Sequence, residues 1–236
     1  MVMRQVDYVL WADYIEKLIV KHNLNKEKVL NLACGTGSLD IILRKRGWNI
    51  AGVDFSEDML DIAEDKAEGA GIELELYQGR MESFVLDEKF PLILCLYDSM
   101  NYLLEEKQVQ DCFYTVSEHL KPNGSFIFDV TTEYNILEHF ANQTISEVFK
   151  DSALIWENSY NFEKKLCESE LTIFLEEDGV YKRYEEEHNQ KIYSRKFLKQ
   201  ALSNAGMEIL GIYSGFTLVP PKPASERVHF VARKRL

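Results

Sequence analysis

A glycine turn and an acid that follows it are the residues best suited to hold a ligand. Gly35-Thr36-Gly37 comes directly after the apolar run KVLNLAC at 28–34, and Asp54 ends the next apolar run. Glycine lets a backbone approach a ligand closely, and a carboxylate can accept hydrogen bonds from both hydroxyls of a ribose. Where a dinucleotide fingerprint has its third glycine, this chain has Asp40, whose charge opposes a pyrophosphate. The combination favours an adenosine ligand that lacks phosphates.

A second group of polar side chains lies further along the chain. Lys182, Tyr184, Glu186, His188 and Gln190 alternate along one expected strand and share one face. His188 could take a proton from an amine or a hydroxyl nucleophile, and the alternative is an ordinary surface histidine. The acidic run at 185–187 is either a solvated edge that discourages strand pairing or an attraction for a cationic substrate.

Hydrophobic periodicity predicts the elements that must position these residues. From residue 28 to 130, short apolar strands alternate with amphipathic helices, which indicates parallel strands joined by helical crossovers. Ligands of such sheets bind beyond the carboxyl ends of the strands. Alternating polar segments then predict an antiparallel insertion over 145–192 with a turn at 176–179. We expect other strands at 28–34, 48–55, 72–78, 90–97, 124–130, 207–218 and 226–234, and helices at 6–22, after Gly37, after Ser56, over 109–120, over 133–141 and after Ser194.

The composition limits the class of protein. The chain has 236 residues, 46% of them hydrophobic, and a formal net charge of −12. This charge repels nucleic acid and anionic membranes, so neither is an expected partner. The four cysteines form no CxxC pair, and the histidines have no metal-ligand spacing. Without a signal peptide or a run long enough to cross a bilayer, the sequence predicts a soluble, cytoplasmic protein, either a monomer or a homodimer.

Taken in order, the motifs resemble those of class I S-adenosylmethionine-dependent methyltransferases. The similar segments are LNLACGTG at 30–37, VDFSEDML at 53–60, GRMESF at 79–84, LILCLYDSMNYL at 92–103 and LKPNGSFIFDV at 120–130. Three further segments resemble a subgroup of small bacterial methyltransferases with a β insertion, whose layout is related to that of nucleotide-sugar N-methyltransferases. These segments are DYVLWADYI at 7–15, CLYDSMNYL at 95–103 and YKRYEEEHNQKIY at 181–193.

The resemblance implies an α/β, Rossmann-like fold. We expect a seven-stranded, mostly parallel sheet with an antiparallel β insertion between strand 5 and the last helix. The methyltransferase core would comprise 1–134 and 192–236, and 135–191 would form a lid over the substrate. S-adenosylmethionine would be the cofactor and S-adenosylhomocysteine its product, with no metal.

The resemblance also implies the residues of the site. Tyr97 and Asp98 would line the transferred methyl group, since a sulfonium favours aromatic faces and carboxylates; the alternative is that Asp98 and Ser99 only cap the next helix. His188, Tyr184 and Glu186 are the other catalytic candidates. Cofactor contacts are expected from Trp11, Asn31, Ala33, Cys34, Gly35, Thr36, Gly37, Asp54, Phe55, Met59, Arg80, Met81, Glu82 and Leu96. For Trp11, the alternative to a cofactor contact is packing in the core.

The expected reaction is methyl transfer to a nitrogen or oxygen atom of a small-molecule acceptor. Three departures from the family pattern weaken individual site assignments and give some weight to an alternative, a cofactor-binding protein without turnover. Asn31 and Arg80 stand where the family usually has acids, and the segment before the first helix is short. A nucleotide-dependent oxidoreductase is a further alternative, which Asp40 disfavours. A methyltransferase acting on RNA conflicts with the net charge, and a protein acceptor stays open.

Overall fold

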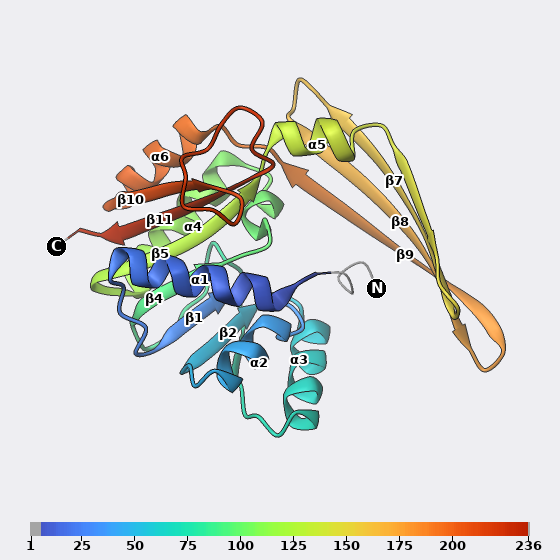
Figure 1. Ribbon diagram of the computed structural model, residues 1–236, viewed down its shortest axis with the longest axis horizontal. Coiled ribbons are helices and arrows are strands. Elements are labelled where there is room, and N and C mark those ends of the chain that lie inside the picture. The colour runs from blue at the N-terminus through green and yellow to red at the C-terminus, as the bar shows by residue number, and fades with distance from the viewer. Residues whose placement is uncertain (1–5, 236) are drawn as a thin grey trace.

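A seven-stranded sheet forms the centre of the computed structural model, which describes residues 6–235 (Figure 1). Its strand order is β10-β11-β5-β4-β1-β2-β3. The five strands from β5 to β3 run parallel, and β11 pairs antiparallel with both β5 and β10. The expected sheet is therefore confirmed. The strands are β1 (Val29–Leu32), β2 (Ile50–Asp54), β3 (Glu75–Gln78), β4 (Phe90–Cys95), β5 (Leu120–Thr131), β10 (Met207–Ser214) and β11 (Arg227–Lys234).

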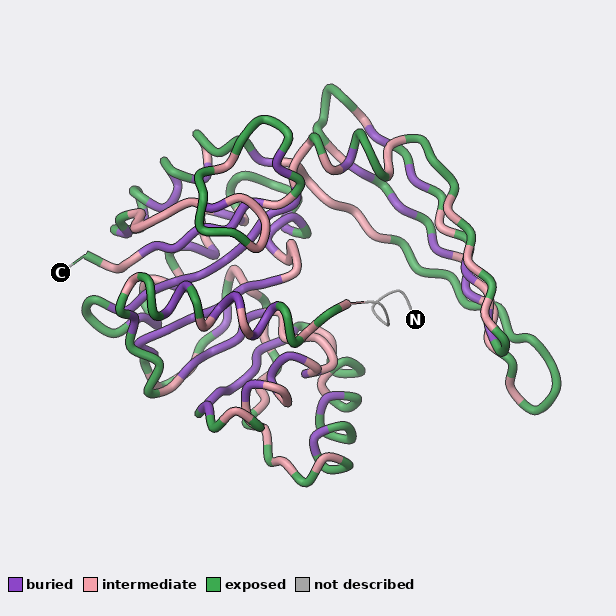
Figure 2. Tube along the Cα trace, viewed as in Figure 1, coloured by how far each residue is buried: buried purple, intermediate pink, exposed green. Residues whose placement is uncertain are grey.

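Helices cover both faces of the sheet, because successive side chains of a buried strand point to opposite sides. In β4, Leu92 and Leu94 pack with α1 and α2, whereas Ile93 and Cys95 pack with α4 and α6. Figure 2 shows the strands as a buried band between exposed helices. The helices are α1 (Tyr8–His22), α2 (Ser38–Lys45), α3 (Glu57–Gly69), η2 (Ser99–Tyr102), α4 (Glu106–His119), α5 (Glu133–His139) and α6 (Arg195–Asn204).

A second sheet leaves the core between β5 and α6 (Figure 1). Its four antiparallel strands have the order β6-β7-β8-β9 and extend away from the central sheet. Asp178 and Gly179 form the expected turn between β8 and β9, and both have positive φ, as a two-residue hairpin requires. The predicted insertion is confirmed. Its strands are β6 (Thr144–Val148), β7 (Ser152–Asn161), β8 (Leu166–Glu177) and β9 (Val180–Lys191).

Several element boundaries differ from those expected. Helix α4 ends at His119. Strand β5 begins at Leu120 instead of residue 124, and its register shifts where it pairs with the start of β4. Strand β10 ends at Ser214 rather than residue 218, because Gly215 has a φ of 49° and turns the chain away. Strand β3 begins at Glu75 rather than residue 72. Within residues 6–235, no helix is long and apolar enough to cross a membrane.

Candidate functional site

The glycine turn joins β1 to α2 at the carboxyl edge of the sheet. Ala33, Gly35 and Gly37 all have positive φ, between 53° and 66°. A Cβ added to Gly35 would meet no atom within 4 Å, whereas one added to Gly37 would lie 3.0 Å from the Cβ of Ala63 on α3. Gly37 therefore lets α3 pack closely, and Gly35 presents bare backbone to the space beyond the strands.

Asp54 shapes this turn from the neighbouring strand. Its carboxylate accepts the N–H of Gly35 at 2.8 Å and the N–H of Ser56 at 3.0 Å. The side chain is buried, with 6% of its surface exposed. A carboxylate offers about four lone-pair sites, so acceptor capacity for ligand hydroxyls is left after these two bonds.

The residue that follows Asp54 in the sequence carries an exposed aromatic ring. Phe55 is 66% exposed and Met59 43%, which is unusual for such large apolar side chains near the end of a buried strand. The guanidinium of Arg80 lies 5.9 Å from the ring of Phe55, and its Nε donates to Glu82 at 2.8 Å. Met81 instead turns inward, and its sulfur contacts the thiol of Cys95 at 3.6 Å. Arg80 and Glu82 therefore lie near the exposed ring of Phe55, whereas Met81 is partly buried against the core.

The floor of the glycine turn is polar. Asn31 on β1 donates from Nδ2 to Oδ1 of Asp40 on α2 at 2.8 Å, and both side chains are buried. Burial raises the pKa of Asp40 to about 7. The thiol of Cys34 fills the space above Gly52, where an added Cβ would clash with it. Thr36 is fixed by the ammonium of Lys66, whose Nζ lies 2.6 Å from the threonine hydroxyl.

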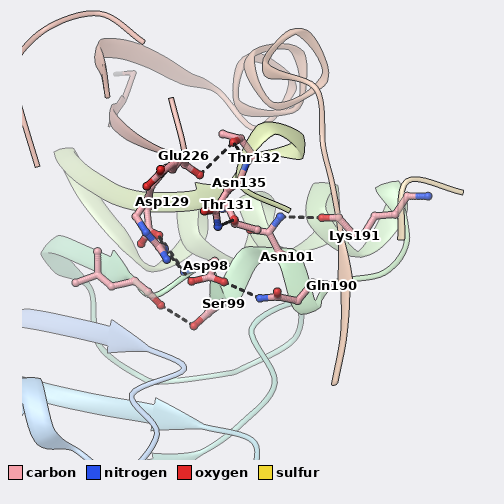
Figure 3. Close-up of polar contacts among 12 residues, drawn as sticks. Asp98, Ser99, Asn101, Asp129, Thr131, Thr132, Asn135, Gln190, Lys191 and Glu226 are labelled. Carbon is pink, nitrogen blue, oxygen red and sulfur yellow. Dashed lines mark hydrogen bonds and ion pairs between the residues drawn. The ribbon is translucent and has the colours of Figure 1, made fainter. Parts of the chain in front are cut away.

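Tyr97 and Asp98 follow β4 in a left-handed conformation, with φ of 61° and 51°. The carboxylate of Asp98 pairs with Arg227 at 2.7 Å and accepts from Gln190 of β9 at 2.6 Å (Figure 3). Burial outweighs the nearby Arg227 and raises the pKa of Asp98. Asp98 precedes η2 without a side-chain capping bond, so its carboxylate is used in this network rather than as a cap.

The ring of Tyr97 belongs to an aromatic cluster with α1. Its centroid lies 4.1 Å from that of Trp11 and 5.3 Å from that of Tyr8. Trp11 is 5% exposed and lies in the core. This agrees with the alternative that Trp11 packs in the core. Leu96, which precedes Tyr97, is also buried in that core. Both side chains therefore have little exposed surface with which to contact a ligand.

His188 is brought from the insertion to the end of the fourth strand. Its Nδ1 lies 3.2 Å from the hydroxyl of Tyr102, and its Nε2 lies 3.1 Å from the carboxylate of Glu186. Tyr184, on the same strand, instead donates to Glu177 at 2.6 Å near the hairpin turn. The structure thus brings together His188 and Glu186 but directs Tyr184 elsewhere.

Sequence reasoning missed four contributors to this site, namely Tyr102, Asp129, Gln190 as a partner of Asp98, and Arg227. Tyr102 and Asp129 lie inside segments that carry the family resemblance, LILCLYDSMNYL and GSFIFDV, which was the available signal. Arg227 lies in no such segment. Among residues 6–235, no group of three or more His, Cys, Asp or Glu side chains could hold a metal ion.

Comparisons with known proteins agree with this geometry. Residues 29–124 match the family model described as a methyltransferase domain. A methyltransferase-family protein of Geobacillus sp. is 35% identical over 98% of this chain and 95% of its own length. The methyltransferase-family protein YqeM of Bacillus subtilis is 30% identical over 98% of this chain and 92% of its own length.

Solved structures give the same fold. An S-adenosylmethionine-dependent methyltransferase from Clostridium acetobutylicum is 29% identical, with a TM-score of 0.91 over 100% of this chain and 95% of that one. DesVI of Streptomyces venezuelae shares the fold at 20% identity, with a TM-score of 0.80 over 100% of this chain and 94% of that one. The chain belongs to the class I S-adenosylmethionine-dependent methyltransferases.

Proposed function

We propose that this protein transfers a methyl group from S-adenosylmethionine to a nitrogen or oxygen atom of a small molecule. The observation that carries the proposal is the hydrogen-bonded series Tyr102, His188 and Glu186 beside the end of β4. A nitrogen or oxygen nucleophile releases a proton when it is methylated, and this series provides a place for that proton.

The residues around the glycine turn fit this cofactor. Asp54 keeps acceptor capacity for the ribose hydroxyls. Phe55 and Met59 offer exposed apolar surface to the adenine ring, with Arg80 and Glu82 at its edge. Backbone at Ala33, Cys34, Gly35, Thr36 and Gly37 can approach the ligand closely. Bound S-adenosylmethionine would supply a methyl group that is already activated, so positioning is the main task of the protein.

The hydrogen bonds fix the direction of proton movement. An ionised Glu186 can only accept, so Nε2 of His188 must carry the hydrogen that it shares with Glu186. Nδ1 is then the acceptor for the Tyr102 hydroxyl. An acceptor molecule can therefore pass its proton to the Tyr102 oxygen while Tyr102 passes its own to His188. Glu186 stabilises the imidazolium that results.

Tyr102 needs this partner, because its own pKa is high. Partial burial and the nearby carboxylates of Asp98 and Glu186 raise the pKa of Tyr102 to about 12. Near neutral pH the hydroxyl of Tyr102 is therefore protonated, and a protonated phenol alone is a weak base. Transfer of its proton to His188 in the same step removes this difficulty.

We assign the insertion, residues 135–191, as the lid over the acceptor. Its last strand is joined to the core beside Tyr97 and Asp98, the residues proposed to line the transferred methyl group. Gln190 donates to Asp98, and the buried amide of Asn101 donates to the carbonyl of Lys191 at 2.8 Å (Figure 3). Movement of this strand would shift His188 relative to Tyr102, so lid position and proton transfer are coupled.

A relative of known substrate supports a class of acceptor. A dTDP-3-amino-3,4,6-trideoxyglucose N,N-dimethyltransferase of Streptomyces venezuelae is 30% identical over 53% of this chain and 52% of its own length. We therefore place aminosugar nucleotides first among the candidate acceptors, followed by simple amines and phenols.

The test is a screen for S-adenosylhomocysteine formation. Purified protein is incubated with S-adenosylmethionine and each acceptor, and products one methyl group heavier are sought by mass spectrometry. We expect turnover with an amine or a hydroxyl compound. Cofactor binding without turnover on any acceptor would support the non-catalytic alternative. Binding of NADH in place of S-adenosylmethionine would support an oxidoreductase.

A further inference from the structure

A cavity lies between the start of α5 and the loop that joins β10 to β11. Thr132, the N-cap of α5, donates to the carbonyl of Ser225 at 2.7 Å and holds this loop beside the helix (Figure 1). The volume of the cavity is about 360 Å³, which lies within the range of ~300–1,000 Å³ that is typical of small-molecule sites. The larger and polar side chains that line it are Asn135, Ser214, Phe216, Ser225, Glu226 and Arg227.

Two of these side chains keep hydrogen-bonding capacity. Both ion pairs of Arg227, with Asp98 and Asp129, use Nη1. A guanidinium has five N–H groups, so those at Nε and Nη2 are left for other acceptors. Asn135 donates from Nδ2 to the hydroxyl of Thr131 at 2.9 Å (Figure 3). Its second N–H and its carbonyl oxygen are left in the same way.

The loop side of the cavity adds a hydroxyl hydrogen and an acceptor. The hydroxyls of Ser214 and Ser225 are bonded to each other at 2.6 Å, and Ser225 Oγ also accepts the backbone N–H of Lys222 at 2.8 Å. One hydroxyl hydrogen of the serine pair is used in their mutual bond, so the other remains. Glu226 pairs with His139 at 3.0 Å through Oε1, which leaves Oε2. The cavity therefore presents both donors and acceptors.

The lining combines these polar groups with an aromatic ring and has no excess of positive charge. Phe216 is half-buried, and its ring packs edge-on against Trp11 with centroids 4.9 Å apart. The charge of Arg227 is outweighed by its two carboxylate partners, and Glu226 adds another acid. A phosphate or carboxylate would find no net attraction here. Hydroxyl groups, each both donor and acceptor, suit the mixed polar lining.

We propose that this cavity binds the hydroxylated ring of the methyl acceptor, such as the ring of an aminosugar. This inference rests on the proposed function and names the part of the acceptor that the protein recognises. The apolar C–H face of such a ring would pack on Phe216, and its hydroxyls would bond to Asn135, Ser214, Glu226 and Arg227. A nucleotide linked to the ring would extend into solvent, because the cavity has neither the volume nor the charge for a diphosphate.

The cavity adjoins the residues that are proposed to act on the acceptor. Arg227 bonds to Asp98 at 2.7 Å. Thr131, which accepts from Asn135, donates its backbone N–H to the buried side chain of Asn101 at 3.0 Å (Figure 3). Asn101 lies on η2, the short helix that also carries the tyrosine of the proposed proton route. A ring held in the cavity is therefore connected to both the methyl position and this route.

The first experiment compares acceptors that differ in what the cavity would bind. The probes are 3-amino-3-deoxyglucose and its positional isomers, the dTDP-linked forms of these sugars, and cyclohexylamine, which has a ring and an amine but no hydroxyl. Formation of S-adenosylhomocysteine is followed with each. We expect the KM of the best aminosugar to be at least about tenfold lower than that of cyclohexylamine, because cyclohexylamine leaves the polar lining unpaired. The dTDP-linked form should bind about as well as the free sugar.

Two variants test the lining itself. Asn135→Ala and Ser214→Ala should each raise the KM for the best aminosugar by about five- to tenfold, since each removes a partner of a ligand hydroxyl. Neither should change the KM for cyclohexylamine or the affinity for S-adenosylhomocysteine, which shows that the fold is kept. Glu138→Ala, an exposed position of α5 outside the lining, is the matched control and should leave all three values unchanged.

Calorimetry separates this inference from the proposed function. The aminosugars are titrated into protein saturated with S-adenosylhomocysteine, so that binding is measured without turnover. Aminosugar binding that is lost in both cavity variants, with no amine methylated, would support the cavity and contradict the proposed function. Three results would overturn the cavity assignment alone: methylation with equal KM for aminosugars and cyclohexylamine, binding of the dTDP-linked forms only, or aminosugar binding that both variants leave unchanged.

Discussion

The carboxylate of Asp129 accepts a hydrogen bond from the backbone N–H of Asp98 at 2.9 Å. It also accepts from the N–H of Tyr97 and from the guanidinium of Arg227. Tyr97 and Asp98 are consecutive non-glycine residues with positive φ, a conformation that costs of order 1–3 kcal/mol at each. Asp129, fully buried at the end of the adjacent strand, thus holds the strained residues that precede η2.

Replacement of this anchor should destabilise the protein. Asp129→Asn leaves Arg227 with one carboxylate and weakens the bonds to both strained amides. We expect a loss of about 3 kcal/mol in the free energy of unfolding, measured by urea denaturation. Glu133→Gln, which breaks the exposed pair with Lys165, is the control and should cost under about 1 kcal/mol. Equal losses in the two variants would show that Asp129 is not an anchor.

Asp54→Ala should weaken cofactor binding. Removal of a charged acceptor for the ribose costs about 1.5–3 kcal/mol, which corresponds to a dissociation constant for S-adenosylhomocysteine about 10- to 150-fold higher. Because Asp54 also holds the N–H of Gly35, part of this loss will come from a looser turn. Calorimetry of Asp58→Ala, which removes an exposed carboxylate from α3, is the control for the loss of a negative charge near the site. An unchanged dissociation constant would remove Asp54 from the site.

Tyr102→Phe should reduce methyl transfer by about 10²–10⁴-fold, since the phenyl ring cannot receive a proton. His188→Gln should have a similar effect, and the affinity for S-adenosylhomocysteine should stay unchanged in both variants. Tyr181→Phe, an exposed tyrosine on the same strand as His188, is the matched control. The screen for S-adenosylhomocysteine formation provides the assay. Full activity of Tyr102→Phe would exclude the proposed proton route.

Asp40 also predicts a pH dependence of stability. Its pKa in the folded protein is raised to about 7 from 3.8, so the folded state holds the proton more tightly than the unfolded chain. Stability from this group is therefore present below pH 4 and is lost as the pH rises toward 7. Asp40→Asn should match wild type in urea denaturation at pH 4 and exceed it by about 1–3 kcal/mol at pH 8. A constant difference at both pH values would refute this.

Local signals were enough to predict most elements. Ser56 and Ser194 cap their helices as expected, and each accepts the N–H three residues later. The turn at Asp178-Gly179 has the residue types that its conformation requires. Strand β10 was predicted too long because the apolar residues after Gly215 continue the pattern, although the backbone does not. A positive φ at one glycine does not change the hydrophobic periodicity of the sequence around it.

The parts of the site that could not be predicted depend on pairs far apart in the sequence. Tyr102 meets His188 across 86 positions, and Arg227 meets Asp98 across 129. The first pair forms because the insertion strand β9 packs against η2, and the second forms because β11 pairs with β5 beside β4. The left-handed conformation of Tyr97 was equally hidden, because it is held by Asp129 from another strand. Spacing rules describe one element at a time and contain no information on these contacts.

We propose that the glycine turn and Asp54 bind S-adenosylmethionine. Thermal melting of the protein with S-adenosylmethionine, S-adenosylhomocysteine or NADH is the first measurement to make. A ligand that binds only the folded state at 100 times its dissociation constant adds about 2.7 kcal/mol of stability. We predict a clear rise in melting temperature with the first two ligands and none with NADH. A rise with NADH alone would show that the glycine turn and Asp54 bind a dinucleotide instead.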